Sequence, residues 1–115
     1  MNIQIYHNPR CGKSREALQY LKDKGIEPKI ILYLQNSPTF DELKELIRKL
    51  KINPTELIRK KEKIFIENYS SSLISDDEWI KVMTEHPILI ERPIIISGNK
   101  AVIGRPKERI DEVIG

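Results

Sequence analysis

The sequence predicts an α/β fold with a mixed four-stranded sheet, built from a β-α-β unit, a helical insert and a β-β-α unit. Two observations favour this class. Apolar runs at residues 3–6 and 29–34 flank a segment with helical periodicity, and two short apolar runs at 94–96 and 101–103 are joined by a turn. Because 115 residues are typical of one compact domain, we expect a single domain over 1–115 with the insert at about 37–86.

The first unit has the pattern of two strands joined by a helix. Ile3 and Ile5 alternate with polar residues, as in a strand. Residues 14–24 carry their apolar side chains on one helical face, and Gly25 is a natural helix end. Residues 29–34 are almost continuously apolar, which is typical of a buried strand. A strand, helix and strand of this spacing predict a right-handed parallel crossover.

The insert is predicted to be helical. Thr39 is a candidate N-cap for a helix over 40–50, where apolar residues recur at helical spacing. A short helix is expected at 54–58. Residues 62–74 show no clean period, so we expect turns and partial helix there. Residues 76–85 again have a helical pattern.

The C-terminal segment predicts a hairpin followed by a helix. Gly98-Asn99 between the two short strands is a tight-turn signal. The last helix is expected over about 106–113, with Pro106 in its first turn, where proline is favoured. The order β-α-β, helices, β-β-α is that of a thioredoxin-like fold with a helical insert.

Composition limits the classes of function. The N-terminal residues are expected to form a strand and not a signal sequence, and no apolar run is long enough to span a membrane. A lone cysteine indicates a reducing compartment, so we expect a cytoplasmic protein. The 20 basic and 17 acidic residues are interspersed, which gives little support to nucleic-acid binding. One cysteine and two distant histidines have no metal-ligand spacing, so no metal site is expected.

Cys11 is the residue with the clearest chemical signal. It stands where the first predicted strand passes into the first predicted helix, and unpaired N–H groups at a helix start stabilise a thiolate and bind oxyanions. Arg10, Lys13 and Arg15 add positive charge around it, which also lowers a thiol pKa. The alternative is a small buried apolar residue. We favour a reactive thiolate.

His7 lies four residues before Cys11, at the end of the first strand. It is either a structural donor that holds the loop or a group that tunes the thiol, directly or through Ser14. We favour structural and electrostatic support over base catalysis, because a thiolate formed at neutral pH needs no base.

Three arginines lie at the ends of predicted elements, namely Arg59, Arg92 and Arg105. Strand ends form the ligand crevice of an open α/β sheet, and the planar fork of arginine suits a tetrahedral oxyanion. Arg92-Pro93 opens a predicted central strand, where thioredoxin-like folds place a cis proline. By this fold analogy we expect Pro93 to be cis.

Four segments of the chain together resemble the glutaredoxin-coupled arsenate reductase family. They are YHNPRCGKSR at 6–15, LIRKKE at 57–62, HPILIERPII at 86–95 and GRP at 104–106. The resemblance extends in order over essentially the whole chain. It implies a thioredoxin-like fold with a helical insert, a nucleophile at Cys11, a thiol-tuning His7, and oxyanion binding by Arg59, Arg92 and Arg105.

The chemistry implied is arsenate reduction with external thiols, as in arsenical resistance. The Cys11 thiolate would attack arsenic and form a thiol–arsenate adduct. Because the chain has no second cysteine, an external thiol is needed. The resemblance implies glutathione, or another small thiol, as co-substrate and a glutaredoxin-like protein that regenerates Cys11. No bound cofactor is expected. Two alternatives stay open: a general thiol oxidoreductase on the same scaffold, and a regulator of the Spx type that binds RNA polymerase. Ser14 stands where the Spx-type regulators carry a second cysteine.

Glu91 brings a carboxylate next to Arg92, where a reductase of the family carries a neutral amide. Adjacent residues of an extended chain point to opposite faces. We therefore expect the Glu91 side chain to face solvent.

Overall fold

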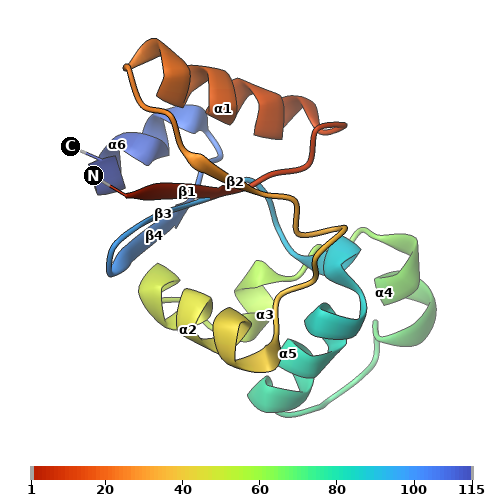
Figure 1. The fold of residues 1–115 in the computed structure, drawn as a ribbon. Helices are drawn as coiled ribbons and strands as arrows, with labels where there is room; N and C mark the ends of the chain where they lie inside the picture. Colours follow the sequence, from red (N-terminus) through yellow and green to blue (C-terminus); the bar gives the residue numbers. More distant parts are fainter. Residues whose placement is uncertain (1, 115) are drawn as a thin grey trace. The chain divides into compact units, whose positions relative to one another are not determined.

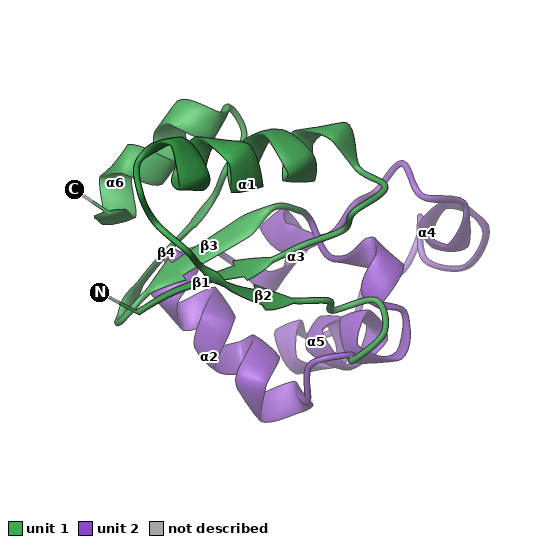
Figure 2. Ribbon diagram, turned by 45° about the horizontal axis from the view of Figure 1, so that its top comes forward, with its two compact units in different colours: residues 1–36, 92–115 green, residues 37–91 purple. Residues whose placement is uncertain are grey.

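The structure is a computed structural model that describes residues 2–114. It divides into two compact units, a sheet unit of residues 1–36 and 92–115 and a helical unit of residues 37–91 (Figure 2). The helical unit begins at Ser37 and ends at Glu91. The single domain with an insert at about 37–86 stays a prediction. Each unit is described by itself below.

The sheet unit contains four strands in the order β2-β1-β3-β4. Their bounds are Ile3–Tyr6 for β1, Lys29–Ile31 for β2, Ile94–Ser97 for β3 and Lys100–Ile103 for β4. β1 pairs in parallel with β2, and the β1–β3 and β3–β4 pairs are antiparallel. The mixed four-stranded sheet and the β-α-β and β-β-α order confirm the predicted thioredoxin-like fold class.

Helices cover one face of this sheet (Figure 1). They are α1 (Gly12–Asp23), the 3₁₀ turn η2 (Lys107–Ile110) and α6 (Asp111–Ile114). Ala17 and Leu21 of α1 and Ile110 of η2 are fully buried in one cluster with Ile5 and Ile95 of the central strands. Burial of these apolar side chains holds α1 and η2 against the central strands.

Strand β2 corrects one expectation. A buried strand was expected over 29–34, but β2 covers only Lys29–Ile31 and lies at the edge of the sheet. Ile30 is 44% exposed, whereas Tyr33, beyond the strand, is fully buried. An apolar run alone does not distinguish a central strand from an edge strand that leaves the sheet early.

The helical unit contains α2 (Phe40–Leu50), α3 (Pro54–Leu57), α4 (Lys63–Asn68), α5 (Asp76–Glu85) and the 3₁₀ turn η1 (Pro87–Leu89). Thr39 caps α2 as expected: its side chain accepts from the N–H of Glu42, whose carboxylate accepts from the N–H of Thr39. Ser75 and Glu78 make the same reciprocal pair at α5. Such capping boxes satisfy N–H groups that the first turn leaves free.

Candidate active site

The loop between β1 and α1 places the sulfur of Cys11 at a helix start. Cys11 is the N-cap residue of α1, and its N–H donates to the carbonyl of Asn8 at 2.9 Å. The Asn8 side chain accepts from the N–H of Arg10 at 3.0 Å. Nη1 of Arg15 donates to the carbonyl of Pro9, also at 3.0 Å. Each of these contacts holds the loop in the turn that presents the thiol.

The surroundings of Cys11 favour its thiolate. Partial burial by itself raises the pKa of the thiol. Backbone N–H groups of Ser14 and Lys13 and the guanidinium of Arg92 act in the opposite direction and outweigh it, so the pKa lies below its ordinary value. A cysteine with a lowered pKa and partial exposure is the reactive type.

Arg105 also contacts the sulfur. Its Nη2 lies 3.6 Å from Sγ of Cys11 as a hydrogen-bond donor, while its Nε donates to the carbonyl of Arg92 at 2.8 Å. Arg92 lowers the pKa of the thiol together with the backbone N–H groups of Ser14 and Lys13, whereas the hydrogen bond to the sulfur comes from Arg105. Both guanidinium groups therefore act on the same sulfur. Two arginines expected at an oxyanion site are thus brought to the thiol.

Ser14 connects His7 to this loop. Its hydroxyl lies 2.6 Å from Nδ1 of His7 and accepts from the N–H of Asn8 at 3.0 Å. Ser14 is fully buried and His7 is nearly so. Burial is the largest cause that lowers the pKa of His7, followed by the charges of Arg15 and Lys22. A neutral imidazole is thereby favoured near pH 7, and it contacts Ser14 rather than serving as a charged donor.

Pro93 and Gly104, the sequence neighbours of Arg92 and Arg105, are held close together. The Arg92-Pro93 bond is cis, and so is Arg105-Pro106. The N–H of Gly104 donates to the carbonyl of Pro93 at 2.9 Å. A Cβ at Gly104 would lie only 2.9 Å from Cδ1 of Ile95, so this close approach requires glycine.

Arg59 belongs to the helical unit, where two carboxylates flank it. Its Nη1 lies 3.5 Å from Glu62 and its Nε lies 3.7 Å from Glu91. The expectation that Glu91 extends into solvent is wrong, since its side chain is 27% exposed and forms this ion pair. The role of Arg59 in oxyanion binding stays a prediction.

Sequence reasoning missed the part played by Asn8. Its side chain caps the turn of the loop and its N–H fixes Ser14. The Asn-Pro pair was the available signal, because asparagine side chains commonly accept from a backbone N–H two residues later. The carboxylate partners of Arg59 were missed as well, and no local pattern indicates them.

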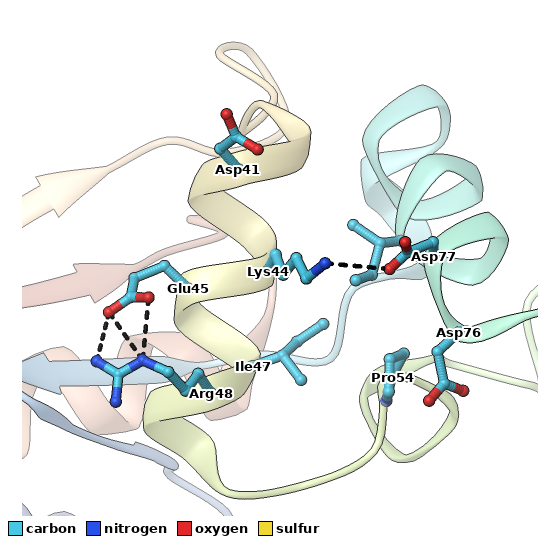
Figure 3. A pocket seen from close by; sticks show the side chains of 9 residues that line it. Asp41, Lys44, Glu45, Ile47, Arg48, Pro54, Asp76 and Asp77 are labelled. Carbon is cyan, nitrogen blue, oxygen red and sulfur yellow. Dashed lines mark hydrogen bonds and ion pairs between the residues drawn. The ribbon is translucent and has the colours of Figure 1, made fainter.

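The surfaces of the units are hollowed in places. A hollow of about 280 Å³ is in the sheet unit beside the loop and is lined by His7, Asn8, Pro9, Arg10, Leu32, Leu34 and Gln35. Another, of about 480 Å³, lies between α2 and α5, with an ion pair from Lys44 to Asp77 across it (Figure 3). Within residues 2–114 no cluster of metal-ligating side chains is found, and no helix there is long and apolar enough to cross a membrane.

Comparison with known proteins gives consistent matches over nearly the whole length. The ArsC family matches residues 6–113. YfgD of Escherichia coli K12, an uncharacterized protein, is 44% identical over 98% of this chain and 97% of its own. An arsenate reductase of Haemophilus influenzae is 44% identical over 99% of this chain and 100% of its own. The solved arsenate reductase of Vibrio cholerae is 45% identical, covers 99% of this chain and 98% of its own, and has a TM-score of 0.95.

Proposed function

Since the chain belongs to the ArsC family, we propose that it reduces arsenate to arsenite through Cys11, with glutathione as co-substrate and a glutaredoxin as the regenerating protein. The observation that carries the proposal is the sulfur of Cys11, which lies at the start of α1 with Nη2 of Arg105 at 3.6 Å. This arrangement combines a nucleophile with donors for the oxygens of a tetrahedral anion.

The first step is displacement at arsenic. The Cys11 thiolate attacks arsenic(V), a sulfur–arsenic bond forms, and one oxygen leaves as hydroxide, which is protonated to water. Arg92 and Arg105 donate to the remaining oxygens and offset their charge. On the family resemblance, Arg59 is a third donor to the anion. His7, Ser14 and Arg15 keep the loop in place and act on the thiol without touching the anion.

The second step transfers two electrons. A glutathione thiolate attacks Sγ of Cys11, a disulfide forms, and the sulfur–arsenic bond breaks with its electron pair kept by arsenic, which leaves as arsenite. A glutaredoxin thiol then takes the glutathione from Cys11 and restores the thiolate. Cys11 is the one cysteine of the chain, so the second sulfur must come from outside. A cytoplasmic setting supplies such reduced thiols.

A coupled assay tests the proposal directly. Purified protein, glutathione, glutaredoxin and glutathione reductase are mixed, and NADPH oxidation is followed with and without arsenate. We expect oxidation that depends on arsenate and on Cys11, and that stops when glutathione or glutaredoxin is left out. Turnover of a glutathione mixed disulfide with no response to arsenate would instead support a general thiol oxidoreductase. Co-purification of RNA polymerase with an inactive protein would support the Spx-type alternative.

A further inference from the structure

An isolated antiparallel bridge in the helical unit sets the direction of two charged side chains. Ile58 pairs with Ile90, and both are buried. The N–H groups of Arg59 and Glu91 make the flanking main-chain hydrogen bonds, at 2.7 and 2.8 Å. Successive residues of an extended chain point to opposite sides. Arg59 and Glu91 therefore lie on the side opposite to the two isoleucines, and their side chains meet there.

Two carboxylates offset the charge of Arg59. Nε of Arg59 lies 3.7 Å from Oε1 of Glu91, and Nη1 lies 3.5 Å from Oε1 of Glu62. The exposed fractions of the three side chains are 23% for Arg59, 24% for Glu62 and 27% for Glu91. Charges this far removed from water are screened less than surface charges. These three side chains, Arg59, Glu62 and Glu91, form the cluster discussed below and carry one positive and two negative charges.

Although two carboxylates offset the charge of Arg59, its N–H groups make few hydrogen bonds to them. Nη1 is buried and has no hydrogen-bond acceptor among the described residues, even though Glu62 lies within ion-pair distance. The separation of 3.7 Å from Nε to Glu91 is also too long for a hydrogen bond. Arg59 thus has its charge offset by two carboxylates, while Nη1 and Nε make no hydrogen bond to either of them.

We propose that Glu91 and Glu62 make Arg59 a selective anion donor, one that favours a singly charged tetrahedral oxyanion over a doubly charged one. This inference rests on the proposed oxyanion-binding role of Arg59. A ligand oxygen gains hydrogen bonds from the guanidinium, but each negative charge on the ligand is repelled by the two carboxylates. Glu91 is the specificity-determining residue of this cluster, because the bridge between Ile58 and Ile90 pairs its segment with that of Arg59 and leaves both side chains on the same side.

The test compares two anions of similar shape and different charge, sulfate and methanesulfonate. Apparent dissociation constants are obtained from the rise of the melting temperature with anion concentration at constant ionic strength. Arg59→Ala gives the non-specific stabilisation by each salt, which is subtracted. We expect the parent protein to bind methanesulfonate at least as tightly as sulfate. Glu91→Gln should tighten sulfate binding by about tenfold and methanesulfonate by about threefold, since Coulomb energy scales with the ligand's charge.

Two further variants complete the design. Glu62→Gln should shift the dissociation constants for sulfate and methanesulfonate in the same direction as Glu91→Gln does. It replaces Glu91→Gln in the test if that variant does not fold. Glu45→Gln is the matched control: it also removes a carboxylate from an arginine ion pair, but the pair with Arg48 lies on the exposed face of α2 (Figure 3). It should shift neither constant.

Two results would overturn the inference, and they are distinguishable. Equal shifts for both anions, or no shift in Glu91→Gln and Glu62→Gln, would reject charge selection alone and leave the proposed reduction of arsenate intact. If neither anion binds the parent protein or any other variant more tightly than it binds Arg59→Ala, Arg59 does not donate to anions. Both the inference and that part of the proposed site then fail.

Discussion

The hydroxyl of Ser14 lies 2.6 Å from Nδ1 of His7, and both residues are buried. The backbone N–H of the same serine is the largest cause that lowers the pKa of the Cys11 thiol. His7 therefore contacts the residue next to the thiol loop, and an effect of His7 on the thiol through Ser14 stays a prediction. Ser14 is therefore a positioning residue, because its hydroxyl contacts both Nδ1 of His7 and the N–H of Asn8.

Replacing Ser14 with alanine should affect both stability and the thiol. The change leaves the buried N–H of Asn8 and Nδ1 of His7 without their partner, which costs about 1–3 kcal/mol of unfolding free energy. Alanine keeps the backbone N–H that acts on Cys11, so a rise in the pKa of Cys11, measured from the pH dependence of iodoacetamide alkylation, is expected only from displacement of the loop that the Ser14 hydroxyl holds. Ser70→Ala is the control, because the exposed Ser70 hydroxyl donates only to the carbonyl of Ile66, and it should change stability by less than about 0.5 kcal/mol.

His7 should make the protein less stable in mild acid. Burial, Arg15 and Lys22 lower the pKa of His7, so the unfolded chain binds a proton that the folded chain does not. Stability from this group is complete above the unfolded pKa of about 6.5 and is lost as pH falls through the lower folded pKa. The melting temperature should therefore fall below that pH, and His7→Gln should flatten the slope. An unchanged slope in His7→Gln would contradict the assignment, and the same substitution at His86 separates the two histidines.

Short sequence patterns predicted those parts of the fold that depend on residues close together in the sequence, namely helix caps and tight turns. Thr39 has its partner three residues away, and the capping box at α2 follows from that spacing alone. The hairpin of β3 and β4 likewise turns at Gly98, whose φ of 59° favours glycine. The position of Cys11 at the start of α1 was predictable for the same reason.

The errors lie where distant segments decide the outcome. Ile30 is exposed because β2 is an edge strand, and strand order is not encoded in residues 29–34 themselves. Glu91 meets Arg59 because Ile58 pairs with Ile90, a contact between residues far apart in the sequence. Alternation along an extended chain does not indicate what occupies the face toward which the Glu91 side chain points.

The thiol of Cys11 should titrate below the range of a free cysteine. Backbone N–H groups of α1 and the charge of Arg92 outweigh the effect of burial on its pKa. The midpoint of alkylation by iodoacetamide should therefore lie below about 8.5. A midpoint at or above this value would reject the reactive thiolate. Cys11→Ser should abolish arsenate-dependent turnover with an unchanged circular dichroism spectrum, and retained turnover would indicate another nucleophile.

Gly104→Ala should destabilise the sheet unit by overpacking. A Cβ at this position would lie 2.9 Å from Ile95, 3.3 Å from Pro93 and 3.4 Å from Ile110. Extra volume in such a packed place costs about 1–3 kcal/mol, read as a lower melting temperature. Gly12→Ala is the matched control, since its nearest neighbour would be an Arg15 side-chain atom at 3.8 Å. An equal loss of stability in both variants would show that packing at Gly104 is not the cause.

Lysine should only partly replace Arg105 in arsenate use, because Arg105 makes two contacts in the fixed geometry of its guanidinium fork. Nε donates to the carbonyl of Arg92 and Nη2 to the sulfur of Cys11. A hydrogen bond from a charged group contributes about 1.5–3 kcal/mol of binding free energy. Arg105→Ala should therefore raise the KM for arsenate by about tenfold or more. Lysine keeps the charge without the fork, so Arg105→Lys should recover only part of the loss. Arg109→Ala, which removes an exposed arginine paired with Glu112, should leave KM unchanged. Full recovery by lysine would show that charge alone matters at this position.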